Sequence, residues 1–219
     1  MIAPETLQFL KKLDRNNDRD WFNAHKTDFE RAKDNITALT GYLIGEIAKF
    51  DPAVAGTLPE ACVFRIYRDI RFSKDKSPYK TNLGAYIAPG GRKSMLPGYY
   101  IHIQPGQCFV AAGKHMPDPG ELLKIKAAIA RNPKAFLGIV EKRSFREKFG
   151  VLHGERLSRP PKGFSNDSPA IEYLKLKSFT VFNDYRTDKT IISPDFPKTV
   201  VKDFKAMFPL VDYLRRVLH

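Results

Sequence analysis

The feature that most constrains the fold is a run of short segments with strand character in the middle of the chain. Residues 62–67, 83–88, 98–103 and 108–112 alternate apolar and polar positions or are rich in β-branched and aromatic residues. Pro and Gly turns at residues 89–91 and 105–106 stop the second and third segments. Short strands separated by such turns favour an antiparallel meander over βαβ units.

Helical patterns precede this region. Pro4 fits the first turn of a helix, and Asn16 and Asn17 interrupt the apolar stripe that follows it. Asp18 or Asp20 can cap a second helix, whose apolar residues recur at helical spacing up to residues 51–52. The first 50 residues are therefore predicted to be helical.

Helical patterns resume after the meander. We expect helices over residues 119–130, 133–142, 145–150, 168–175 and 195–218, the last interrupted at Pro209, and a further strand over residues 179–185. No repeat or long linker divides the chain. The sequence therefore predicts one α+β domain over residues 1–219, with a central antiparallel β-meander packed against N-terminal and C-terminal helices.

Composition fits a globular protein that needs no membrane. Of the 219 residues, 42% are hydrophobic, and no apolar run approaches the roughly 18 residues that a membrane span needs. The N-terminus lacks the cationic-then-apolar order of a secretory signal. Cys62 and Cys108 lie in apolar stretches, which favours buried thiols over a disulfide. We therefore expect a cytoplasmic protein without a membrane partner; its oligomeric state is left open.

The positive charge is concentrated in the middle of the chain. The formal net charge is +13, and residues 60–162 alone carry 20 Lys and Arg against 8 Asp and Glu, a net of +12. Such an asymmetry predicts a localised positive surface. The alternative is a basic, solvated face that only aids solubility.

The densest part of this region is the motif at residues 65–80, which reads RIYRDIRFSKDKSPYK and carries six cations. Arginine can hold a carboxylate or phosphate through two parallel hydrogen bonds, and lysine adds compact charge. Tyr67, Phe72 and Tyr79 add stacking surfaces. We predict that the motif runs from a strand into a loop and binds an anion, with Arg65 anchored and residues 71–80 presented. The alternative is a structural salt-bridge network of Arg65 or Arg68 with Asp69 and carboxylates of the N-terminal helices.

Other chemistry finds little support in the sequence. The five histidines show no metal-ligand spacing, and no nucleotide-binding or nucleophile-elbow motif is present, so no metal or cofactor is expected. His102 alternates with Ile101 and Ile103, and we interpret it as a structural histidine. Ser73 has no base near it in sequence. The lysines around Asp69 and Asp75 disfavour a divalent cation unless phosphate binds as well.

Three long segments carry a family resemblance: FLKKLDRNNDRDWFNAHKTDFE, RIYRDIRFSKDKSPYKTNLGAYI and RPPKGFSNDSPAIEYLKLKSF. With GYYIHIQPG between them, the sequence resembles domain-of-unknown-function family twenty-four sixty-one, small uncharacterised proteins found mainly in bacteria. The resemblance spans essentially the whole chain and implies no assigned activity. One segment departs from it, because AAGKHMP has Lys114 and His115 where the family is usually glycine-rich with an aromatic residue.

The resemblance also implies which segments meet. Asn17, Trp21 and Lys26 from the first segment, and two lysines from LKLKSF, recur with the central motif, so we expect them to meet it in space. Simple core packing is the alternative for Trp21, and a solvated pair for the two lysines. The predicted ligand-binding set is Arg65, Arg68, Asp69, Arg71, Ser73, Lys74, Lys76, Tyr79, Lys80, Lys175 and Lys177.

Three functions remain open at this point. The first is a binding protein for a small anionic molecule that bears phosphate or carboxylate. The second is an enzyme acting on a phosphorylated or nucleotide substrate, with Asp69 or Tyr79 as the acid–base group. The third is a nucleic-acid or protein-interaction module. An enclosed pocket at the motif favours the first two, whereas an exposed basic surface favours the third.

Overall fold

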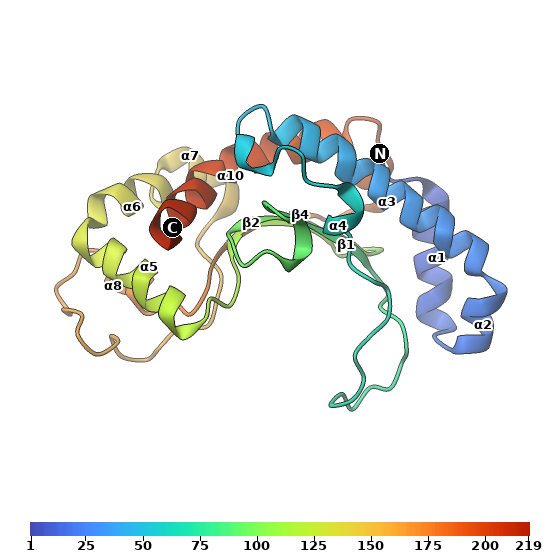
Figure 1. Cartoon of the computed structure of the whole chain (residues 1–219), viewed down its shortest axis with the longest axis horizontal. Helices are drawn as coiled ribbons and strands as arrows, with labels where there is room; N and C mark the ends of the chain where they lie inside the picture. The colour runs from blue at the N-terminus through green and yellow to red at the C-terminus, as the bar shows by residue number, and fades with distance from the viewer. The chain divides into compact units, whose positions relative to one another are not determined.

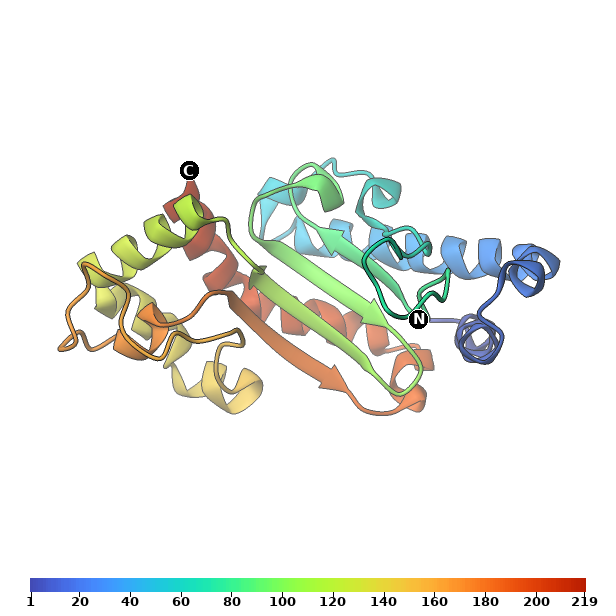
Figure 2. The same ribbon diagram turned by 90° about the horizontal axis from the view of Figure 1, so that it is seen from below.

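The computed structural model describes residues 1–219, and Figure 1 shows how the chain runs. The chain forms an α+β fold in which helices flank a four-stranded antiparallel sheet, as predicted. The strands are β1 (Leu83–Ile87), β2 (Gly98–Ile103), β3 (Cys108–Lys114) and β4 (Phe179–Tyr185), and they lie in the order β1-β2-β3-β4 (Figure 2). The first three strands form the expected meander.

The helices follow the patterns of the sequence in most places. They are α1 (Pro4–Arg15), α2 (Arg19–Ala24), α3 (Lys26–Ile47), α4 (Pro59–Cys62), α5 (Pro119–Arg131), α6 (Pro133–Val140), α7 (Arg143–Phe149), α8 (Ile171–Leu174), α9 (Asp188–Ile192) and α10 (Phe196–Leu218), with short 3-10 turns η1 (Pro52–Val54) and η2 (Gly91–Lys93). Pro4 occupies the first turn of α1, and the Asp18 side chain caps α2 by accepting from the Trp21 N–H at 2.8 Å.

Three expectations for the helices were wrong. The long helix predicted after Asp18 is divided at His25, which ends α2 and precedes α3. The helix predicted over 168–175 shrinks to the four residues of α8. Pro209 lies inside α10 without interrupting it. Phe204, Met207, Leu210 and Leu214 are fully buried around this proline, and burying such side chains offsets the cost of about 3 kcal/mol that an internal proline carries.

The strand expected over residues 62–67 was also wrong. Pro59 begins the single turn of α4, which ends at Cys62, and the extended chain after it pairs at isolated points only. Val63 bridges Ala85, and Tyr67 bridges Tyr79. Since bridges at isolated points are too few for a ladder, the segment lies along the outer edge of β1 without becoming a strand of the sheet.

The chain forms two compact units, each built from three stretches. The first unit comprises residues 1–94, 100–110 and 184–202, and the second comprises residues 95–99, 111–183 and 203–219. In the first, α1 and α3 pack together and α3 packs on β1. In the second, buried rings fill the core: Phe136 meets Phe179 edge-on, and Tyr99 lies 5.1 Å from Phe204. That residues 1–219 form a single domain stays a prediction.

Both cysteines are free and buried, as predicted. Burial raises the pKa of Cys62 and of Cys108 to about 11, so neither thiol ionises near neutral pH. No helix combines the length and apolarity that crossing a membrane requires.

Candidate functional site

The motif forms a long loop on a short paired stem in the first unit. The stem is held by hydrogen bonds from Phe64 N to Gly84 O at 2.9 Å, from Arg68 N to Pro78 O at 2.9 Å and from Lys80 N to Ile66 O at 2.8 Å. Between the stem's two sides, residues 69–77 form an irregular loop that projects from the edge of the sheet beside β1 (Figure 1). The prediction that residues 73–78 form a loop is confirmed.

Two aspartates shape this loop. Asp69 accepts two parallel hydrogen bonds from the Arg71 guanidinium, at 2.9 and 2.6 Å, which lower the pKa of Asp69. Asp75 accepts from the backbone N–H and the hydroxyl of Ser77, at 2.9 and 2.6 Å, and pairs with Arg68. The bonds from Ser77, and then those from Arg68, lower the pKa of Asp75. Two of the six cations are thus neutralised within the motif.

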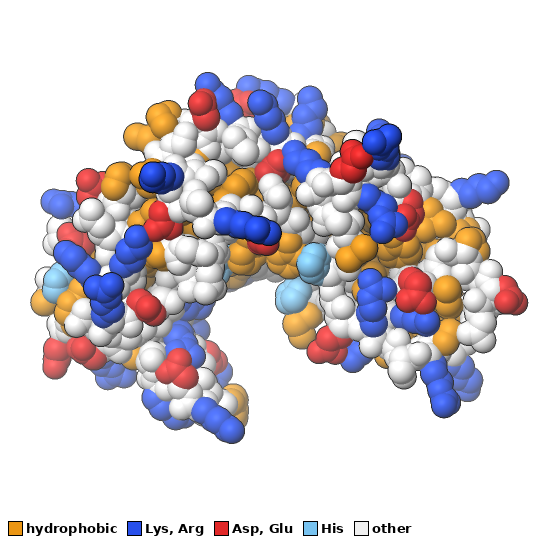
Figure 3. All heavy atoms as spheres, turned by 180° about the vertical axis from the view of Figure 1, so that it is seen from behind, with side chains coloured by type: hydrophobic (Ala, Val, Ile, Leu, Met, Phe, Trp, Pro, Cys, Tyr) orange, Lys and Arg blue, Asp and Glu red, His pale blue; other side chains and the backbone are white.

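The other four cations of the motif form no ion pair. Arg65 is exposed and forms no ion pair, so the expectation that it is anchored was wrong; Arg68, whose side chain is 26% exposed, is the anchored arginine. Lys74 and Lys76 are also exposed, and Lys76 donates to Ile70 O at 3.0 Å. Lys80 donates to Arg65 O at 3.2 Å, and its pKa is lowered by burial and then by the charge of Arg65. Figure 3 shows Lys and Arg side chains on the surface of the projecting loop.

The base of the loop is anchored to the N-terminal helices. The Asn17 side chain donates to Tyr79 O at 2.9 Å and accepts from Tyr79 N at 3.1 Å. The Tyr79 ring stacks on Phe22 at 3.9 Å between centroids. The structure therefore brings Asn17 to the motif, as expected. Trp21 stacks instead on His25 and Phe9, and neither Trp21 nor Lys26 hydrogen bonds with the motif.

The two lysines predicted from LKLKSF lie in the second unit. Lys175 pairs with Glu172 at 2.7 Å, and Lys177 pairs with Glu155 at 2.8 Å. Their membership of a site with the motif stays a prediction.

A polar cavity of about 340 Å³ opens at the base of the loop. Arg68 and Lys80 contribute positive charge to it, and Asp14 and Asp75 contribute an equal number of negative charges. The remaining lining is neutral and hydrogen-bonding: Asn17, Ser77, Tyr79, Thr81 and Asn82. Because its formal charges cancel and Arg68 is paired with Asp75, this cavity is not the basic pocket that the sequence suggested.

Beside this cavity, a row of rings crosses the outer face of the sheet. Phe64 lies edge-on to Tyr100 at 6.1 Å, Tyr100 lies 5.8 Å from Phe109, and His102 stacks on Phe109 at 4.6 Å. We call Phe64, Tyr100, His102 and Phe109 the ring row. All four are half-buried. Sequence reasoning missed the row, although the alternation of Tyr100 and His102 with buried Ile101 and Ile103 marks one exposed face of β2.

His102 sits at the centre of a polar network. Its Nδ1 accepts from the Tyr100 hydroxyl at 2.9 Å and lies 3.4 Å from the Asn82 amide nitrogen, while its Nε2 lies 2.9 Å from Gln104 Oε1. The neutral ring with its proton on Nε2 satisfies all three contacts. Burial lowers the pKa of His102 and raises the pKa of Tyr100 to about 12, so both groups stay uncharged at neutral pH.

This network makes stability depend on pH. A lowered folded-state pKa means that the unfolded chain binds more protons, so the contribution of His102 is complete above its unfolded pKa of about 6.5 and is lost as pH falls below it. We therefore expect the urea midpoint to fall between pH 7.5 and pH 5.5, and to fall less in His102→Gln. If the urea midpoint falls equally in the native protein and in His102→Gln, folding does not lower the pKa of His102.

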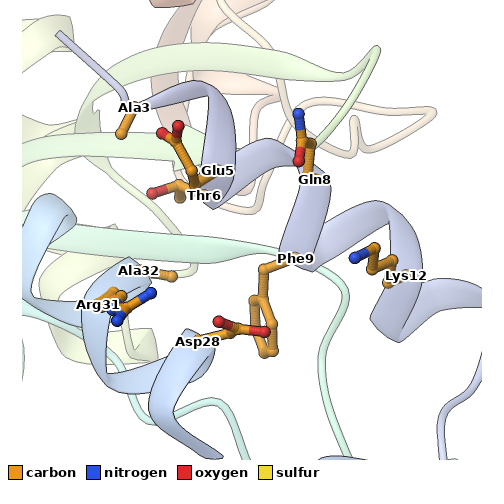
Figure 4. A pocket seen from close by; sticks show the side chains of 9 residues that line it. All are labelled: Ala3, Glu5, Thr6, Gln8, Phe9, Lys12, Asp28, Arg31 and Ala32. Carbon is orange, nitrogen blue, oxygen red and sulfur yellow. The ribbon is translucent and has the colours of Figure 1, made fainter. Parts of the chain in front are cut away.

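A further cavity, of about 380 Å³, lies between α1 and α3 in the same unit. Figure 4 shows Phe9 and Lys12 of α1 facing Asp28 and Arg31 of α3, with Glu5 on the same helix as Phe9. Its two acidic and two basic side chains give no charge preference, and it contains no residue of the motif. No cluster of three or more His, Cys, Asp or Glu side chains could hold a metal ion.

The comparisons with known proteins give one match. A family model described as "Conserved hypothetical protein (DUF2461)" matches residues 5–213. No curated protein and no solved structure matches the chain.

Proposed function

The chain belongs to the DUF2461 family, and we propose that its projecting loop binds a ligand that carries several phosphate groups. The observation that carries the proposal is the set of cations that form no ion pair: Arg65, Lys74, Lys76 and Lys80. Cations gathered on one surface attract a polyanion and release its counterions on binding.

The internal pairs of the loop support this proposal. Asp69 and Asp75 neutralise Arg71 and Arg68 and hold the loop through short bonds to its own backbone and side chains. A loop shaped in this way presents its remaining cations at a smaller cost in conformational entropy when the ligand binds. The salt-bridge network weighed as an alternative has other members here, because Arg68 pairs with Asp75 and Asp69 pairs with Arg71. Four cations of the motif form no ion pair.

The pKa shifts of Asp69 and Tyr79, the two groups suggested for acid–base chemistry, favour binding over catalysis. Hydrogen bonds from Arg71 lower the pKa of Asp69, and burial raises the pKa of Tyr79. Both changes move the pKa away from neutrality, whereas an acid–base catalyst works best with a pKa near the operating pH. An exposed, charged loop also suits an extended anion better than a small molecule that needs an enclosed site.

The test is a charge reversal on the loop. In Lys74→Glu/Lys76→Glu, we expect the affinity for linear inorganic polyphosphate to fall about tenfold or more, because two attractions become repulsions. Isothermal titration calorimetry in about 50 mM salt measures it, and binding by the native protein should weaken steeply as salt rises.

The matched control is Lys124→Glu/Lys134→Glu, which makes the same change of net charge at exposed lysines of α5 and α6. It should keep most of the affinity. If both double variants weaken binding equally, the attraction belongs to the net charge of the chain and the proposal fails. A native affinity that stays constant with salt would contradict it as well.

A further inference from the structure

We infer that the first unit binds single-stranded nucleic acid, with the phosphates on the basic loop and the bases stacked on the ring row. This inference rests on the proposed function and names its ligand class. It adds a second contact surface, formed by Phe64, Tyr100, His102 and Phe109, that the charge pattern of the motif does not reveal.

The ring row begins at the loop itself. The Lys80 ammonium group lies 5.5 Å from the centroid of the Phe64 ring, and Phe64 leads to Tyr100 and then to Phe109. The row thus crosses from the edge segment over β1 and β2 to β3. With strands about 4.8 Å apart, three such steps span about 14 Å. Stacking platforms on sheets of this kind accommodate two or three bases.

Gly84 makes the row continuous. It lies on β1 between Phe64 and Tyr100, and a Cβ added there would stand 2.7 Å from the Tyr100 hydroxyl oxygen. The missing side chain lets the two rings meet across β1. On the opposite face, Leu83, Ala85 and Ile87 are buried, and α3 packs on β1 behind the sheet in Figure 2. The ring row therefore occupies the face that these core contacts leave.

Each end of the row opens into a cavity with an arginine or lysine. At one end, the cavity of about 340 Å³ at the base of the loop contains Lys80 and Asn82. At the other, a second cavity of about 340 Å³ is lined by Phe109, by Asp184 and by Arg186, which forms no ion pair. The rings thus lie between Lys80 and Arg186, although each cavity as a whole carries no net formal charge. Single strands bind where their bases can stack and their phosphates meet such cations.

The chemistry of the row favours bases over other partners of a basic surface. Half-buried rings offer stacking surface, and the amides of Asn82 and Gln104 beside His102 offer donors and acceptors to a base edge. A duplex has its bases stacked internally, so only a single strand can use these rings.

The test compares three fluorescently labelled probes by anisotropy: a 12-nucleotide oligothymidine, a 12-unit abasic strand with the same backbone, and a 12-base-pair duplex. The oligothymidine should bind about tenfold or more tightly than either of the others, since stacking contributes about 5- to 150-fold per base. With four cations engaged, log K should fall with log salt at a slope of about −3.

The ring row is tested by Phe64→Leu and Phe109→Leu, which keep an apolar side chain and remove the aromatic face. Each should weaken oligothymidine binding about tenfold and leave polyphosphate binding unchanged. The matched control is Tyr42→Leu, because Tyr42 is an aromatic residue of the same unit that is 42% exposed and lies outside the row. It should change neither affinity.

The outcomes separate the two proposals. If the abasic strand or the duplex binds as tightly as oligothymidine, while Lys74→Glu/Lys76→Glu still weakens polyphosphate binding, the ring-row inference is overturned and the proposed function stands. If neither polyphosphate nor oligothymidine binds, both are overturned. The probe comparison uses the native protein, so it decides the question even where a leucine variant fails to fold.

Discussion

Replacing Gly113 with alanine is expected to lower the free energy of unfolding by about 3–5 kcal/mol. Gly113 lies on β3 with a φ of +124°, a conformation that costs other residues about 1–3 kcal/mol. An added Cβ would also stand 2.1 Å from the carbonyl oxygen of Phe179 on β4. Because that neighbour is backbone, relief requires the two strands to separate, and overpacking of this kind costs about 1–3 kcal/mol more.

Gly138 on α6 offers the matched control in the same unit. No atom lies within 4 Å of the Cβ that alanine would add there, and alanine in a helix is favoured over glycine by about 0.5–1 kcal/mol. Urea unfolding followed by circular dichroism should therefore move the midpoint in opposite directions for Gly113→Ala and Gly138→Ala. A Gly113→Ala midpoint equal to that of the native protein would contradict the close approach of β3 and β4.

Replacing Glu121 with alanine is expected to lower the free energy of unfolding by about 3–5 kcal/mol. Lys114 is buried, with 5% of its side chain exposed, and its ammonium group donates to Glu121 Oε1 at 2.7 Å and to the carbonyl oxygen of Met95. Removing the carboxylate leaves a buried, unpaired charge, which costs about that much. The other carboxylate oxygen accepts from Asp118 N at 2.9 Å in the capping box of α5, and this bond is lost too.

The double variant Lys114→Met/Glu121→Gln separates these causes. It removes both charges, and glutamine can still accept the bond from Asp118 N, so stability should return to within about 1 kcal/mol of the native protein. Chemical unfolding of the two variants and the native protein measures the difference in the free energy of unfolding. If the double variant is as unstable as Glu121→Ala, the buried charge is not the cause.

Local signals were enough to predict most of the fold. Pro4 and Asp18 begin their helices where expected, and the turns at residues 89–91 and 105–106 separate three strands that follow one another in sequence. The strand predicted over residues 62–67 was wrong because strand propensity does not show whether a neighbouring segment forms a full ladder of hydrogen bonds with it. The interruption predicted at Pro209 was wrong because the burial of apolar side chains along α10 offsets the cost of a proline inside a helix.

The site was harder to predict, because strand pairing brings together residues that lie far apart in the sequence. The motif itself could be recognised in the sequence. Asp69 and Arg71 are only two residues apart, so their ion pair is a local contact. Nothing local indicates that Arg65 is exposed while Arg68 is held by Asp75. The row formed by Phe64, Tyr100 and Phe109 can be recognised only when the strand register is known, because the absent side chain of Gly84 lets Phe64 and Tyr100 meet across β1. The hydrophobic pattern and the turns set this register, but which rings become neighbours depends on the pairing of residues that lie far apart in the sequence.

The interleaving of the two units along the chain has a consequence for the gene. Strands β2, β3 and β4 each begin in one unit and end in the other, so each unit is assembled from three separate stretches of coding sequence. No single truncation point can release either unit intact. A unit of this kind cannot be inherited, duplicated or fused to another protein by one recombination event, and this favours transmission of the whole coding sequence as a single block.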